Sequence, residues 1–150
     1  MGRVIGMLVA FALANALATP DALNGVTLGE ETTAVIQRLG LVPLRAALEP
    51  GQFQVRVFPT TKATMSITFD DKIRMITVMS NGSSFVDPYG VKLGDSLDKL
   101  LSLRGNPTSK NESTYLYGSS DQVRWEYDIK EGSVAMIIVA DCRNPGFCSP

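Results

Sequence analysis

An internal repeat constrains the fold of this chain more than any other feature. The pattern Gly-Val-x-Leu-Gly occupies residues 25–29 and recurs, 65 positions later, at residues 90–94. A later apolar segment, residues 73–78, matches residues 134–139 at an offset of 61. The changing offset indicates two related halves that differ in loop length.

The halves span residues 22–86 and 87–142, and each is expected to form a short helix followed by antiparallel strands. Acidic residues after the repeated motif favour a helix N-terminus, for which Gly29 or Asp95 is the expected cap. Both helices are expected to end at glycine. Apolar residues at helical spacing predict the buried face of each helix. These residues are Val35, Ile36 and Leu39 in the first half and Leu97, Leu100 and Leu101 in the second.

Alternating apolar residues predict the strands. The expected strands are residues 53–57, 65–69 and 73–79 in the first half and residues 114–118, 123–128 and 134–140 in the second. A second small helix is expected over residues 43–50, where the second half has a polar loop at residues 106–113. The sequence therefore predicts an α+β fold in which two tandem helix-plus-antiparallel-strand repeats share or abut one helix-covered sheet.

The first 18 residues have the order of a secretory signal peptide. One basic residue and the terminal amine precede an apolar run over residues 4–14, and small residues at Ala16 and Ala18 suit cleavage before Thr19. Cleavage after Ala16 and an uncleaved buried or membrane-anchoring helix are the alternatives. The expected product is a single domain, residues 19–150, that is secreted or periplasmic. No cysteine near the cleavage site offers a lipid attachment point, so neither a tether nor an integral membrane span is expected after processing.

The two cysteines, Cys142 and Cys148, lie six positions apart near the C-terminus. Pro145 and Gly146 can turn the chain between them, and export favours an oxidised pair. We therefore expect a disulfide that closes a C-terminal tail over residues 142–148 and contributes about 2 kcal/mol in the chain-entropy model. A redox or nucleophilic role is the alternative, disfavoured because the spacing is not Cys-x-x-Cys and no histidine is available to activate a thiolate.

The composition argues against several classes of function. Fourteen Lys and Arg against fifteen Asp and Glu leave a net charge of −1, so the chain has no field that would attract nucleic acid. It contains no histidine, which removes the usual triad base and the commonest zinc ligand. Ser96 and Lys99 form a Ser-x-x-Lys pattern, but the companion motifs of serine enzymes are missing. We expect no enzyme, no metal and no cofactor, with a small serine-dependent hydrolase as the last alternative.

Both halves resemble the repeat of the β-lactamase inhibitory protein, which is shared with the SmpA/OmlA-type lipoprotein of the outer-membrane β-barrel assembly machine. The matching features are the Gly-x-x-x-Gly openings at residues 25–29 and 90–94, the short helix that follows, the Gly-x-Pro at residues 105–107 and the Trp-x-Tyr at residues 125–127. The first half has Ile-Thr-Phe at residues 67–69 in place of the aromatic pair. The resemblance implies tandem helix-plus-sheet units whose concave sheet surface grips another protein, and it implies no catalytic residue.

On this basis we expect an exported protein-binding module, in its most specific form an inhibitor of a secreted or periplasmic enzyme. A cell-envelope assembly or structural protein is the alternative. The candidate contact residues are sheet aromatics, which dominate binding hot spots, and two charged neighbours. They are Trp125, Tyr127, Tyr115, Tyr117, Arg124 and Glu126. Alternation also allows Trp125 and Tyr127 to be core residues, in which case Arg124 and Glu126 lie on the gripping face. Two glycosylation sequons, at Asn81 and Asn111, are explained more simply as turns.

Overall fold

The computed structural model describes residues 20–23, 25–39, 54–59, 64–79, 86–119, 122–143 and Cys148. For residues 54–59 and 64–69 it describes the course of the backbone only. The predicted signal peptide, the predicted helix over residues 43–50 and the sequon at Asn81 lie outside the described residues.

The described part of the chain forms two helices and nine strands. In chain order they are β1 (Ala22–Leu23), β2 (Val26–Thr27), α1 (Thr32–Arg38), β3 (Gln54–Pro59), β4 (Thr64–Phe69), β5 (Ile73–Met79), α2 (Leu97–Arg104), β6 (Ser109–Lys110), β7 (Thr114–Tyr117), β8 (Val123–Lys130) and β9 (Ser133–Asp141).

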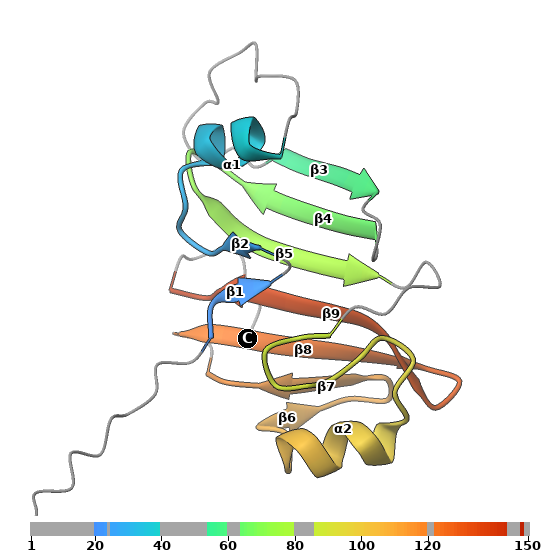
Figure 1. Cartoon of the computed structure of the whole chain (residues 1–150). Helices are drawn as coiled ribbons and strands as arrows, with labels where there is room; N and C mark the ends of the chain where they lie inside the picture. Colours follow the sequence, from blue (N-terminus) through green and yellow to red (C-terminus); the bar gives the residue numbers. More distant parts are fainter. Residues whose placement is uncertain are drawn as a thin grey trace, which may run out of the picture.

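Seven of these strands form one antiparallel sheet that contains both halves of the chain. Its order is β3-β4-β5-β9-β8-β7-β6, while β1 and β2 form a separate hairpin (Figure 1). The last strands of the two halves meet in the interior of the sheet, where β5 pairs with β9. The predicted α+β class is confirmed, and strands of both halves share one sheet as expected.

The pairing of β5 with β9 is symmetric. Thr77 faces Ile138 at its centre, and these are the two residues that the offset of 61 equates. The pairs on either side are Ile76 with Val139 and Val78 with Ile137. The register of this pairing, which we call the seam, is therefore centred on the two residues that the sequence offset equates, and the flanking pairs are exchanged as they would be about a two-fold axis.

The repeated glycine motif makes the same backbone contacts in both halves. The amide of Gly29 donates a hydrogen bond to the carbonyl of Ile73 at 2.7 Å, and the amide of Gly94 donates to the carbonyl of Val134 at 2.8 Å. In each half, the carbonyl of the next residue accepts in return from the same strand residue, at 2.9 and 2.8 Å. These bonds attach the start of each helix segment to the first residues of β5 or β9.

The helix caps differ from the predicted ones. α1 begins after Glu31, and α2 begins after Ser96, whose hydroxyl oxygen accepts from the amide of Lys99 at 3.2 Å. Gly29 and Asp95 are not caps, because the bonds described above commit their backbone to β5 and β9. Each helix therefore begins two residues after the residue that follows the motif and bonds to the strand.

The predicted helix faces are correct for four of the six residues, and Leu101 of α2 is only half-buried and lies outside the core cluster. Val35 and Ile36 of α1 and Leu100 of α2 are buried, and Leu97 packs against the same core. Leu39, in contrast, follows the last turn of α1 and is 38% exposed. A core role for Leu39 is therefore wrong, because the helix ends before the stripe reaches it.

The six strands predicted from alternation are all present, with ends that agree within two residues. Three short strands were not predicted. β6 lies in the predicted polar loop over residues 106–113, and β1 and β2 precede α1. Two-residue strands carry no alternation signal, so pattern reading cannot find them. The turn between β8 and β9 lies at Glu131 and Gly132, both with positive φ, as a tight hairpin turn requires.

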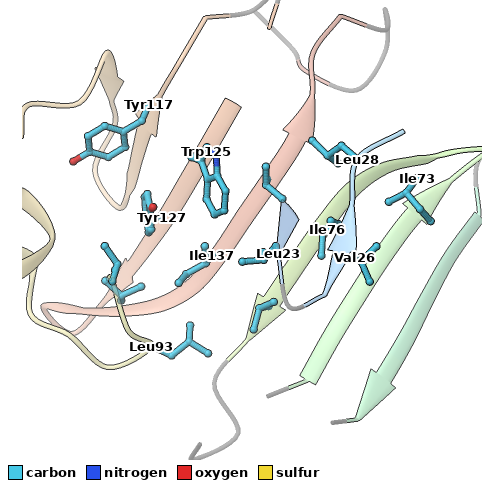
Figure 2. Close-up of a cluster of buried hydrophobic side chains, with 14 of the residues drawn as sticks. Leu23, Val26, Leu28, Ile73, Ile76, Leu93, Tyr117, Trp125, Tyr127 and Ile137 are labelled. Atoms are coloured by element: carbon cyan, nitrogen blue, oxygen red, sulfur yellow. The ribbon is translucent and has the colours of Figure 1, made fainter. Parts of the chain in front are cut away.

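One hydrophobic core lies on one side of the sheet. Buried side chains from the hairpin, both helices, the loop before α2 and the facing sides of β5, β8 and β9 form it. Figure 2 shows Leu23 and Val26 of the hairpin beside Ile76 of β5 and Ile137 of β9. Side chains of both halves are therefore buried together, and the described chain packs as one unit.

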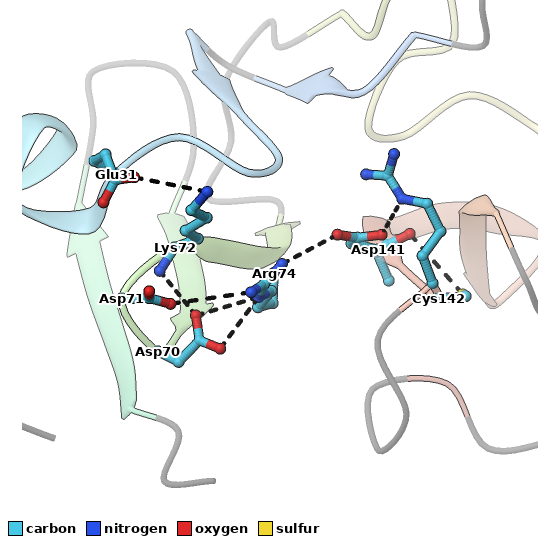
Figure 3. Close-up of polar contacts among 9 residues, drawn as sticks. Glu31, Asp70, Asp71, Lys72, Arg74, Asp141 and Cys142 are labelled. Atoms are coloured by element: carbon cyan, nitrogen blue, oxygen red, sulfur yellow. Dashed lines mark hydrogen bonds and ion pairs between the residues drawn. The ribbon is translucent and has the colours of Figure 1, made fainter. Parts of the chain in front are cut away.

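Polar contacts join the start of β5 to the end of β9 (Figure 3). A guanidinium nitrogen of Arg74 lies 3.4 Å from the carboxylate of Asp141, which is buried and also accepts from Arg143 Nε at 2.5 Å. The next residue, Cys142, forms a disulfide with Cys148, with 5.2 Å between the Cα atoms. The predicted disulfide is confirmed, and one of its cysteines is the residue next to Asp141, which makes the ion pairs.

Candidate functional site

The structure places two of the predicted contact residues in the core. Trp125 and Tyr127 have no exposed surface. The indole N–H of Trp125 donates to the carbonyl of Pro20 at 2.8 Å, and the hydroxyl of Tyr127 donates to the Asp87 carboxylate at 2.6 Å. Neither side chain can touch a partner in this fold, because alternation puts both on the covered side of β8. The core role that alternation also allowed is the one observed.

The two β7 tyrosines lie on the same covered side. Tyr117 is 7% exposed, and its hydroxyl donates to the carbonyl of Gly105 at 3.1 Å. Tyr115 is half-buried and packs against the core. Each pairs across the strands with one of the buried aromatics, Tyr115 with Tyr127 and Tyr117 with Trp125. The four aromatic candidates therefore act as packing residues, and Tyr115 keeps partial exposure at their edge.

Sequence reasoning missed a cation, Arg104, that lies against two of these aromatics, Tyr117 and Tyr127, and against Tyr89. The guanidinium of Arg104, at the end of α2, lies 3.4 Å from the ring centroid of Tyr89 and 4.5 Å from that of Tyr117. Nearby, the buried Asp87 carboxylate accepts hydrogen bonds from the amides of Tyr89 and Val91. Burial raises the pKa of the Asp87 carboxyl, against the opposing effect of its hydrogen bonds. This cluster holds the loop before α2 against the sheet.

The opposite side of the sheet carries the two remaining candidates. Arg124 and Glu126 alternate with the buried aromatics along β8, and both are half-buried. We call this side the open face. By the strand register it is defined by nine residues, three on each strand: Met75, Thr77 and Met79 of β5, Arg124, Glu126 and Asp128 of β8, and Met136, Ile138 and Ala140 of β9. Ala140 is buried between its strand partners, none of the nine belongs to the core cluster, and both described helices bury their apolar side chains on the other side of the sheet.

The methionines of the open face were not predicted as contact residues. Met79 and Met136 are direct partners across β5 and β9, and Met75 lies on the same side of β5. Met79 is 36% exposed. An unbranched thioether side chain adapts readily to the shape of a neighbouring surface. Alternation along residues 75–79 and 136–140 carried this signal, but irregularities in the strand pairing break it just before Met75 and Met136.

Charged side chains lie among these apolar ones. The Arg124 guanidinium is 3.9 Å from the Glu126 carboxylate, and the Asp128 carboxylate accepts from the Thr114 hydroxyl at 2.7 Å. Burial first, and then repulsion by Asp128, raise the pKa of the Glu126 carboxyl, while attraction to Arg124 opposes the rise. On β8 the open face thus carries one guanidinium and two carboxylates.

The structure gives the remaining candidate motifs local roles. The Ser96 hydroxyl caps α2 through the amide of Lys99, so its oxygen accepts from the backbone in the Ser-x-x-Lys segment. The side-chain oxygen of Asn111 accepts from the amides of Ser113 and Thr114, at 3.1 and 2.8 Å. The second sequon therefore forms the turn before β7.

Comparison with protein-family models, with curated proteins and with solved structures found no match to this chain. The resemblance to the repeat of the β-lactamase inhibitory protein therefore rests on the sequence motifs alone. Of the helices that the structure describes, none combines the length and apolar character needed to span a bilayer.

Proposed function

We propose that this chain is an exported, non-enzymatic protein-binding module that contacts another protein through its open face. The observation that carries the proposal is the open face itself, where partly exposed Met and Ile side chains lie beside charged groups. An antiparallel sheet that packs on one side normally presents polar residues on the other. Partly exposed apolar side chains on the side away from the core, bordered by charges, are typical of an interaction surface.

The most specific form of this proposal is an inhibitor of a secreted or periplasmic enzyme. The sequence resemblance to the β-lactamase inhibitory protein supports it, and the disulfide between Cys142 and Cys148 fits an oxidising compartment outside the cytosol. An inhibitor acts by covering a surface of its target, so it needs no catalytic residue of its own.

The proposal is tested by affinity capture from the exported fraction of the host, with residues 19–150 as immobilised bait. The bait is compared with an open-face variant, Arg124→Ala with Glu126→Ala. The matched control is Asp98→Ala with Lys99→Ala, which also removes one acidic and one basic side chain but from the exposed surface of α2. Circular dichroism checks that each variant is folded.

The proposal predicts one enriched protein that is retained by the α2 control and lost by at least tenfold with the open-face variant. If that protein is an enzyme, the wild-type chain should also reduce its turnover. Equal capture by all three baits would contradict binding through the open face. A captured membrane or cell-wall assembly component would replace the inhibitor with an envelope role.

A further inference from the structure

Glu126 has an unusual position on the open face. Its Cα partners are Leu116 on β7 and Ile138 on β9, so an aliphatic residue stands directly opposite on each side. Directly opposite side chains of antiparallel strands lie on the same face, with about 4.5–5.5 Å between Cβ atoms. The Glu126 carboxylate therefore stands between two aliphatic side chains, and its side chain is 24% exposed.

The negative charge of Glu126 is only partly compensated within the described chain. Arg124 approaches its carboxylate to 3.9 Å, which is beyond hydrogen-bonding distance. Asp128, on the same side of β8, adds a second carboxylate, whose hydrogen bond from Thr114 does not change its charge. A carboxylate that is partly desolvated and lies near a like charge gains from the approach of an external cation.

The surroundings of Glu126 restrict which cation can approach. Ile138 lies next to it, and Met79 and Met136 form the neighbouring cross-strand pair. A small hydrated ion would leave these apolar side chains exposed. A lysine or arginine side chain carried on an apolar protein surface can cover them and still place its charge at the carboxylates.

We propose that the open face binds a protein segment that presents a lysine or arginine within an apolar surface, with the cation placed against Glu126 and Asp128. The inference rests on the proposed binding function and adds the chemistry of the partner. The cation provides the specificity by charge complementarity. The methionines and Ile138 provide the apolar contact on either side of the charge.

The test uses the full mature chain, residues 19–150, with ¹³C-labelled methionine methyl groups. The probes are three end-blocked peptides of alternating leucine and threonine that are identical except for a central Lys, Gln or Glu. The proposal predicts that the Lys peptide shifts the methyl signals of Met75, Met79 and Met136 and binds at least tenfold more tightly than the Glu peptide. Because part of the attraction is between exposed charges, the preference should also weaken as salt increases.

Two variants separate the charge effect from the apolar contact. Glu126→Gln should remove most of the preference for Lys over Gln, and Glu126→Lys should reverse the preference toward the Glu peptide. Asp98→Asn on α2 is the matched control and should leave the preference unchanged. A reversal in a folded Glu126→Lys protein would not follow from a merely structural role of Glu126.

Three outcomes would overturn the inference. Equal binding of all three peptides at the open face would leave the proposed binding function standing but remove the role of the cation. If every peptide shifted only methyl groups outside the open face, or if no peptide bound at all, the open face would be excluded as the binding site. Self-association of the chain, lost in Glu126→Gln and unaffected by the Lys peptide, would identify a second copy as the occupant.

Discussion

The hydroxyl of Tyr127 is a single-residue test of the core. It donates to the buried Asp87 carboxylate at 2.6 Å, so Tyr127→Phe leaves that carboxylate without one of its donors. We expect the free energy of unfolding in urea to fall by about 1–3 kcal/mol. The control is Tyr115→Phe, because the Tyr115 hydroxyl makes no hydrogen bond within the described residues. This variant should change the free energy of unfolding by less than about 0.5 kcal/mol. Equal losses in the two variants would contradict the assigned contact.

Asp141 predicts how stability depends on pH. Burial opposes its charge, but the hydrogen bond from Arg143 and the attraction of Arg143 and Arg74 together hold its pKa below the ordinary value of 3.8. The pKa is lower in the folded state, so ionised Asp141 stabilises the fold above the unfolded-state value. That contribution is lost as pH falls through the folded-state value.

The variant Asp141→Asn should therefore be less stable at pH 7, and its stability should decline less steeply than that of the wild type below about pH 4. Urea unfolding at a series of pH values measures both effects. Glu112→Gln, in an exposed turn, is the control and should keep the wild-type slope. An unchanged slope in Asp141→Asn would show that its ion pairs do not contribute.

At the scale of elements, the glycine motif that precedes each helix makes a matched prediction. Gly29 and Gly94 have φ of 82° and 90°, and a Cβ added at either would meet no atom within 4 Å. The cost of alanine is therefore backbone strain alone, about 1–2 kcal/mol. Gly29→Ala and Gly94→Ala should each lower the free energy of unfolding by this amount and agree within about 0.5 kcal/mol. A large loss at one site and none at the other would contradict equivalent roles of the two motifs.

The same elements show how much of the fold could be predicted from the sequence. Strands and helix faces follow from local periodicity, so the six longer strands and residues such as Val35 and Leu100 were predicted correctly. The helix caps were not, because hydrogen bonds from the glycine motifs to β5 and β9 decide where each helix begins. Local sequence does not contain those long-range contacts.

Across the whole molecule, alternation along β8 correctly separated Arg124 and Glu126 from Trp125 and Tyr127. It could not say which side of the sheet would be covered, because that depends on where both helices and the hairpin pack. The aromatics were candidate contact residues because Trp and Tyr dominate binding hot spots, yet they pack in or against the core. The methionines of the open face instead come from β5 and β9, one strand from each half, and these strands are brought together only by their pairing at the seam.

The central claim, that the open face contacts a protein partner, is tested most directly by site-specific photo-cross-linking in the exported fraction. A photoreactive residue replaces Thr77, at the centre of the β5–β9 seam on the open face, or Ser102, on the exposed side of α2. Binding through the open face predicts a cross-link to one protein from position 77 and none to that protein from position 102. A partner that cross-links from position 102 but not from position 77 would contradict it.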